Sequence, residues 1–229
     1  MKTVNGNSLK VVVKIEIKSL SDPDGNLDEE KLERLVMILS NLHNSGMQIL
    51  VVSSGAIALG SKRMGLKSLP EDHIQMQAMA AIGQAELIKI YQHYFEEYNQ
   101  VVAQILLTNQ AMTNAERQAN ARNTFSKLLD KNIIPVINEN DTVSTEDIEL
   151  NDNYPLVLNV ARLVDAHIIL IKSVSDGRYM IVPAGTTTPG IIVNEEELPE
   201  KLAEVAGERS LYEFESRVFP EKFELLNFQ

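Results

Sequence analysis

Short apolar runs alternate with longer segments of helical periodicity along most of the chain. The runs are rich in valine and isoleucine, which favours buried strands. We predict strands at residues 9–17, 47–52, 101–107, 133–137, 168–171 and 178–182. Between them, apolar residues recur every three or four positions, which is the spacing of one helix face. We predict helices at residues 28–43, 71–98, 114–130, 152–163 and 195–205, and a further helix that begins at residue 56.

This alternation of strands and helices predicts the fold class. Strands linked by helices form mostly parallel sheets with helices on both faces. We therefore expect an α/β fold, a three-layer αβα sandwich with a mainly parallel sheet. No internal repeat or long linker divides the sequence, so residues 1–229 are expected to form a single domain.

Several shorter signals refine the pattern. The sequence Asp22-Pro23-Asp24-Gly25 predicts a turn, and Gly46 is placed to end the helix at 28–43. Residues 183–190 predict a loop. Met76, Met79 and Ile82 lie three residues apart in the long helix at 71–98, and this spacing suits either core packing or a surface that faces a partner.

The strand at 133–137 runs directly into polar residues. Its last apolar residue is followed by Asn138, Glu139, Asn140 and Asp141. Polar side chains at the end of a buried strand suit a ligand pocket, because open α/β sheets bind ligands at the carboxyl edge. Asparagine and aspartate are also ordinary turn residues, so a plain polar turn explains this stretch equally well.

A second strand end has small residues instead. The strand at 47–52 continues into Ser53, Ser54 and Gly55, and a helix begins at Ala56. The unpaired amide groups of a helix N-terminus can bind an anion. The alternative is that the tight strand-to-helix connection needs small residues only for packing.

Composition narrows the function classes. The net charge is -11 and the isoelectric point is about 4.9, so the chain repels phosphate backbones and nucleic acid is not expected as a partner. There are 0 cysteines and 4 scattered histidines, so no metal-ligand set is predicted. The sequence MKTVNGNSLK lacks the apolar core of a signal peptide, and no apolar run reaches membrane-spanning length. We expect no membrane association and a cytoplasmic protein.

Four motifs together carry a resemblance to a known family. They are VVVK ending at Lys14, VVSSGAIALG at 51–60, LLDKNIIPVINENDTV at 128–143, and NDN at 151–153. The segment AERQANARNTF at 115–125 is similar to the helix that precedes the family's central strand. The chain resembles glutamate 5-kinase, of the amino acid kinase superfamily, over most of its first 180 residues.

The resemblance implies an activity and a set of site residues. The family uses ATP and Mg²⁺ to phosphorylate the side-chain carboxylate of glutamate, the first step of proline biosynthesis. At the positions that hold the amino acid, this chain has Ser54, Gly55, Asn138, Asp141 and Asn153. Ser54 and its turn would hold glutamate, and Asp141 and Asn153 would contact its amino and carboxylate groups. An ammonium group favours a carboxylate partner, which makes the implied role of Asp141 physically reasonable.

On the nucleotide side, Lys14 matches the lysine that neutralises the transferred phosphoryl group, but the loop that follows it departs from the family. The family has Gly-Thr/Ser-Ser there, and this chain has Glu16, Ile17 and Lys18. A carboxylate about 4 Å from a phosphate costs on the order of 4 kcal/mol at an effective dielectric near 20. If the strand continues, Lys18 points to the same side as Glu16 and offsets part of this cost.

Further nucleotide-side positions are also changed. Tyr154 replaces the last carboxylate of the family's Gly-Asp-Asn-Asp, and Ser173-Val174 replaces its Thr-Asp, which leaves Ser173 as a weak nucleotide-binding candidate. The family's late glycine-rich loop aligns weakly with residues 212–222, where Lys222 matches a second catalytic lysine but no glycine remains. We expect a reduced C-terminal nucleotide lobe without the family's RNA-binding-like domain.

These departures leave two functional hypotheses. The first is a pseudoenzyme, or a regulatory or partner subunit, that keeps a pocket for L-glutamate or a similar small acidic amino acid and binds ATP·Mg poorly. The second is an active glutamate 5-kinase with an altered nucleotide site. In either case the resemblance implies a homo-oligomer or a partner of an intact kinase subunit.

Overall fold

The structure, a computed structural model, describes residues 3–4, 7–22, 26–108, 112–143, 153–173, 176–184 and 190–208. Its main sheet is 7-stranded, in the order β5-β6-β4-β3-β7-β8-β9. The strands are β3 (Lys10–Glu16), β4 (Gln48–Ser54), β5 (Val102–Leu107), β6 (Ile134–Glu139), β7 (Ile168–Lys172), β8 (Tyr179–Pro183) and β9 (Ile191–Val193). Strands β3 to β7 are parallel, and β8 and β9 are antiparallel additions at one edge. A small hairpin of β1 (Thr3–Val4) and β2 (Asn7–Ser8) precedes the sheet.

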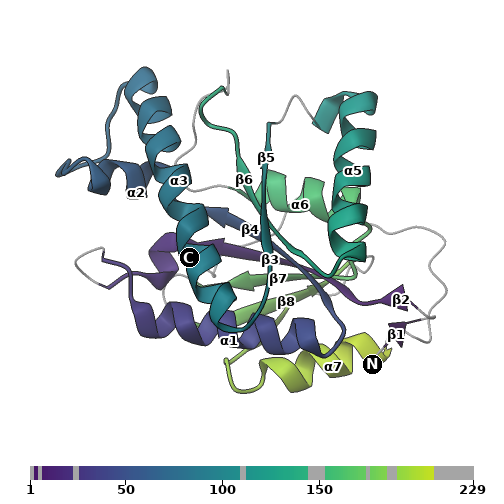
Figure 1. Ribbon diagram of the computed structural model, residues 1–229. Coiled ribbons are helices and arrows are strands. Elements are labelled where there is room, and N and C mark those ends of the chain that lie inside the picture. The colour runs from purple at the N-terminus through teal and green to yellow at the C-terminus, as the bar shows by residue number, and fades with distance from the viewer. Residues whose placement is uncertain are drawn as a thin grey trace.

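Helices cover both faces of this sheet (Figure 1). The helical elements are η1 (Ile17–Leu20), α1 (Glu29–Asn44), α2 (Ala56–Arg63), α3 (His73–Glu97), α5 (Ala115–Asp130), α6 (Tyr154–Leu163) and α7 (Leu198–Glu208). One core cluster joins the sheet to α1, α3 and α7, and a second joins its other face to α5 and α6. The three-layer αβα sandwich with a mainly parallel sheet is therefore confirmed.

Strand β3 shows why the central strands have continuous apolar runs in the sequence. Val11 and Val13 belong to the cluster under α1, α3 and α7, whereas Val12 between them belongs to the opposite cluster. All three are fully buried. Because both faces of a parallel sheet are covered by helices, alternation of apolar and polar residues is lost in its central strands.

Strands β4 and β6 are neighbours in the sheet, and the connections at their carboxyl ends lead to opposite faces. After β4 the chain passes to α2 and α3, and α3 packs on one face. After β6 it passes to α6, which packs on the other face. Ligand crevices in open α/β sheets form where adjacent strands lead to opposite faces. Both strands carry polar residues at this end.

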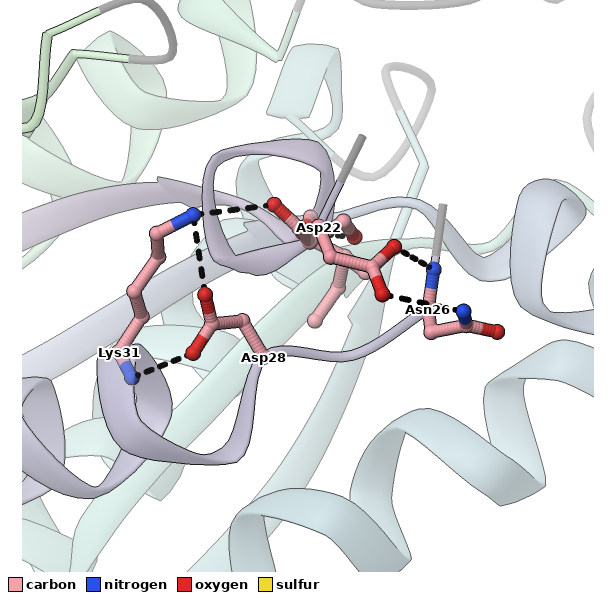
Figure 2. Close-up of polar contacts among 6 residues, drawn as sticks. Asp22, Asn26, Asp28 and Lys31 are labelled. Carbon is pink, nitrogen blue, oxygen red and sulfur yellow. Dashed lines mark hydrogen bonds and ion pairs between the residues drawn. The ribbon is translucent and has the colours of Figure 1, made fainter. Parts of the chain in front are cut away.

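The turn predicted at residues 22–25 lies largely outside the described residues, but Asp22 and Asn26, on either side of the undescribed part, are hydrogen-bonded to each other between η1 and α1 (Figure 2). The amide nitrogen of Asp22 donates to the Asn26 carbonyl at 2.8 Å, and the Asp22 carboxylate accepts from the Asn26 backbone at 2.7 Å. Asp28 then caps α1 by accepting from the Lys31 backbone at 3.1 Å. This hydrogen bond is the main reason that the pKa of Asp28 lies below its usual value. An N-cap of this kind fixes where the helix begins.

Helices α2 and α3 approach at backbone contact. A Cβ built on Gly83 would lie 1.7 Å from the Ala56 carbonyl oxygen, and one built on Gly60 would lie 2.0 Å from that of Met79. No side chain larger than hydrogen fits at either crossing point. The two glycines therefore set how closely α3 lies against the start of α2, which follows β4.

Some predictions of local structure are wrong. Strand β3 ends at Glu16 and the chain turns into η1, so Lys18 does not continue the strand beside Glu16 but lies exposed in η1. The helix predicted at 195–205 begins at Leu198, and β9 was not anticipated. Met76, Met79 and Ile82 are half-buried.

Among the described helices, none is both long and apolar enough to cross a membrane.

Candidate functional site

Asn153 links the carboxyl ends of β4 and β6. The paired register of these strands ends at Val52 and Ile137, one residue before their polar ends. Asn153, the N-cap residue of α6, places its side-chain nitrogen 3.0 Å from the carbonyl oxygen of Ser53 and 3.3 Å from Oδ1 of Asn138. The two strand ends and the start of α6 are thus held together by one side-chain amide.

Two residues behind this amide extend the polar network into the core. Nδ2 of Asn138 donates to Oε1 of Gln84 on α3 at 2.8 Å, and both side chains are buried. The Ser53 hydroxyl lies 2.9 Å from the hydroxyl of Tyr91, also on α3. Burial raises the pKa of Tyr91, so this phenol stays neutral. Hydrogen-bonded polar groups of this kind, buried between a sheet and a helix, fix side-chain orientation.

Asp141 lies in the turn that follows β6. Burial raises its pKa from 3.8 to about 6. In the part of the chain that the structure describes, its carboxylate has no hydrogen-bond or ion-pair partner. A desolvated carboxylate without a cation is stabilised when a positive group binds beside it.

The Ser54-Gly55 turn is explained first by packing. Gly55 has a φ of 109°, a conformation that favours glycine, and it forms the N-cap of α2. A Cβ on Gly55 would lie 2.8 Å from Cβ of Ile17 in η1. The tight connection therefore needs a glycine whether or not a ligand binds, while half-buried Ser54 ends β4 beside the Ser53 carbonyl.

Lys14 lies on β3, the strand next to β4, with its ammonium almost fully enclosed. Its Nζ forms an ion pair with the carboxylate of Glu16, and the two side chains are 3% and 17% exposed. The same ammonium lies 4.2 Å from the centre of the Tyr154 ring, in cation–π geometry. The residues that replace a glycine and a carboxylate of the resembled family are thus the two that surround this lysine.

Ser173 takes part in a turn between β7 and β8. Its amide donates to the Arg178 carbonyl at 2.8 Å, and its hydroxyl accepts from the Asp176 amide at 3.4 Å. The side-chain hydrogen bond from Arg178 is the main cause that lowers the pKa of Asp176 to about 2. These contacts account for a serine at this position by local structure.

A second buried lysine, Lys172, was not anticipated. It lies at the end of β7, 6% exposed, with Nζ 3.2 Å from the hydroxyl of Tyr179 and 4.4 Å from the centre of that ring. Burial is the main cause that lowers its pKa. Asn151, Asp152, Val174 and residues 212–222, which include Lys222, lie outside the described residues, as does most of the loop predicted at 183–190.

The arrangement combines a neutral amide network with one ionisable group. The network brings together Ser53, Asn138 and Asn153, and Asp141 follows Asn138 by three residues. Gln84 was missed because it lies inside a helix. The signal that could have revealed it is a glutamine on the buried stripe formed by Ala80, Gly83, Leu87 and Tyr91. Such a set of donors and acceptors suits a small zwitterion, whose ammonium and carboxylate need opposite partners.

Comparison with known proteins agrees with the family resemblance found in the sequence. The sequence model of the amino acid kinase family matches residues 10–188. The glutamate 5-kinase of Clostridium acetobutylicum is 38% identical over 201 residues, which cover 88% of this chain and 75% of that protein. The glutamate 5-kinase of Listeria welshimeri is 39% identical over 209 residues, 89% of this chain and 75% of that protein.

The fraction of each relative's length that this chain covers differs between relatives. The glutamate 5-kinase of Carboxydothermus hydrogenoformans is 38% identical over 208 residues, which cover 90% of this chain but 56% of that protein. The chain therefore spans about three quarters of some relatives and just over half of others.

Proposed function

Because the chain belongs to the amino acid kinase family and is similar to glutamate 5-kinases over most of its length, we propose that it binds glutamate or a similar small acidic amino acid and transfers phosphoryl groups weakly or not at all. It would then be a pseudoenzyme, or a regulatory or partner subunit. The observation that carries the proposal is the contrast between the two sides of the site. The amino-acid side keeps its polar residues, whereas Lys14 on the phosphoryl side is already paired with Glu16.

The amino-acid side supports binding of a zwitterion. Asp141 offers a carboxylate whose pKa is raised by burial, and a bound ammonium group beside it would stabilise its charged form. The amides of Asn138 and Asn153 are already held in place by Ser53 and Gln84, so little side-chain entropy is lost on binding. Preorganised groups of this kind bind small polar ligands selectively.

The phosphoryl side does not fit ATP with its metal. Glu16 brings a carboxylate, in place of glycine, next to the lysine that would meet the transferred group. In the described part of the chain there is no cluster of acidic or histidine side chains that could hold a metal ion. Phosphoryl transfer depends on positioning and on charge stabilisation around the phosphates, and both are weakened here.

Calorimetry with the two ligands, each added separately, tests this proposal. Glutamate should bind with measurable heat, whereas Mg·ATP at millimolar concentration should give no saturable heat. Succinate, which has two carboxylates but no ammonium, is the control for non-specific anion binding. Tight binding of Mg·ATP, or failure of glutamate to bind, would contradict the proposal.

An active glutamate 5-kinase is the second candidate. It is favoured by the retention of Lys14, buried at the end of the strand where the family places this lysine. In that case the Lys14–Glu16 pair would have to open when the nucleotide arrives. Glutamate-dependent release of ADP at a rate above 1 turnover per second, on the order of typical enzyme rates, would support this reading.

Self-association is also part of the proposal. Strand β5 forms an edge of the sheet, and Val101 beside it is 60% exposed. On the neighbouring α5, Phe125 and Leu129 are the buried residues, so most of this helix is open to solvent. These elements could face a second copy of the chain or an intact kinase subunit. Sedimentation at micromolar concentration tests this, and a clean monomer would argue against a homo-oligomer.

A further inference from the structure

The amide network at the carboxyl ends of β4 and β6 has a defined direction. The Ser53 carbonyl oxygen can only accept a hydrogen bond, so the side-chain atom of Asn153 that lies 3.0 Å away must be its nitrogen. The same nitrogen faces Asn138 at 3.3 Å, which must therefore present its oxygen. Asn138 then turns its own nitrogen to Gln84, 2.8 Å away, which must accept with Oε1. One backbone carbonyl thus fixes the orientation of three side-chain amides.

With the three amides oriented in this way, one hydrogen-bond acceptor, Oδ1 of Asn153, remains for a ligand. The nitrogen of Asn153 is shared between Ser53 and Asn138, and within the described residues its Oδ1 has no hydrogen-bond partner. An oxygen in this position attracts a donor such as an ammonium group. If Asn138 flipped, it would present its nitrogen to the nitrogen of Asn153, and the two donors would repel each other. The Asn153 nitrogen would then lose one of its two acceptors, and the amide would be held less firmly in the orientation that the Ser53 carbonyl sets.

We propose that Gln84 is a positioning residue for the amino-acid pocket. Its Oε1 accepts from Nδ2 of Asn138 and so holds the Asn138 oxygen toward Asn153, which helps the Ser53 carbonyl keep Oδ1 of Asn153 available to the ammonium group of the bound amino acid. Gln84 is 8% exposed and lies on α3, where the close contact at Gly83 fixes the helix backbone against α2. The inference rests on the proposed binding of an amino acid and adds a determinant of its selectivity for an ammonium group.

The test compares L-glutamate with glutarate, which has both carboxylates but no ammonium group. Gln84→Met keeps the length of the side chain and removes its acceptor, whereas Gln84→Glu keeps an acceptor oxygen for Asn138. Gln84→Met should weaken glutamate binding about tenfold, the usual effect of one lost hydrogen bond to a charged group. It should leave glutarate binding unchanged, and Gln84→Glu should restore the preference for glutamate. If Gln84→Met does not fold, Gln84→Asn withdraws the amide by one methylene and serves instead.

A packing control separates positioning from general stability. Leu87→Ala lies one turn further along the same buried stripe, removes no hydrogen-bonding group, and should lower stability without changing the preference for glutamate over glutarate. Equal weakening of both ligands in Gln84→Met, or no rescue by Gln84→Glu, would overturn the inference.

A second readout keeps the inference distinct from the proposed function. Failure of wild-type protein to bind glutamate would overturn the proposed function. The side-chain amide resonances of Asn138 and Asn153 in the ligand-free protein then still test the network by NMR. Both should shift in Gln84→Met and return in Gln84→Glu. Unchanged resonances in Gln84→Met would overturn the positioning role even if glutamate binds.

Discussion

Lys14 and Glu16, two residues apart on β3, form an ion pair in which the lysine side chain is 3% exposed. Alternate residues of a strand point to the same face, which brings the two charges together without any change of backbone. A phosphoryl group that approached Lys14 would have to displace the Glu16 carboxylate or lie beside it. On the proposed function, the pair would oppose nucleotide binding through the negative charge of Glu16 and through its occupation of the space beside Lys14.

Replacement of Glu16 by glycine should strengthen binding of Mg·ATP. At about 8 Å and an effective dielectric near 20, one pair of like charges repels by about 2 kcal/mol, a factor of about 30 in affinity. Calorimetry should detect tighter binding in Glu16→Gly, but glutamyl phosphate should still not form, because the other altered nucleotide positions act together with this one. Glu16→Gln removes the charge and keeps the bulk, and thus separates the two effects. Unchanged ATP affinity in both variants would contradict this account.

Lys14→Ala should leave glutamate binding within about twofold of wild type, less than about 0.5 kcal/mol. The Lys14 ammonium is engaged by Glu16 and Tyr154, so it is not available to the amino acid. Wild-type protein should form no detectable glutamyl phosphate when it is trapped with hydroxylamine. Robust activity in wild type that disappears in Lys14→Ala would instead favour an active kinase.

The sequence predicted the sandwich because its strands are long, β-branched and bounded by clear signals. Val11 to Val13 form a continuous apolar run that favoured a strand, and Asp28 and Gly46 marked the ends of α1 correctly. Strand β9 was missed because it has only 3 residues, two of which are exposed, so it shows no periodicity. Lys18 was misplaced because nothing local shows that β3 ends at Glu16.

The site was only partly predictable. Asn138 and Asn153 could be proposed from the strand-end pattern and the family motif, but their contact joins residues 15 apart in sequence. The link from Asn138 to Gln84 spans 54 residues, and no periodicity encodes a pairing at that distance. The partner of Lys14 was easier to expect, because Glu16 is close in sequence and on the same face of the strand.

Gly83→Ala should destabilise the protein more than a glycine replacement elsewhere. The added Cβ would lie 1.7 Å from the Ala56 carbonyl oxygen, so α2 and α3 must move apart, at a cost of about 3 kcal/mol. Gly65 is the matched control. It has a φ of 72° and nothing within 4 Å of an added Cβ, so Gly65→Ala should cost only about 1 kcal/mol for its backbone conformation. Urea denaturation measures both, and equal losses would argue against a close helix contact.

Asp141→Asn should stabilise the protein at neutral pH while it weakens glutamate binding. Burial raises the pKa of Asp141 to about 6, so the folded protein retains a proton that the unfolded chain releases as the pH rises above about 4. The free energy of unfolding therefore falls between about pH 4 and 6 and stays lower above this range. Because the carboxylate is partly exposed, we expect about 1–2 kcal/mol rather than the full value of the shift.

The asparagine variant removes this ionisation and should lack that pH-dependent loss, which urea denaturation at pH 4 and pH 7 can measure. Its glutamate affinity should nevertheless fall, because a neutral amide replaces the carboxylate that we propose to bind the ammonium group. In wild type, glutamate should bind more tightly as the pH rises through about 6, with release of a proton that calorimetry in buffers of different ionisation enthalpy detects. If the variant is less stable than wild type at pH 7 and binds glutamate equally well, Asp141 is a structural turn residue and does not contact the ligand.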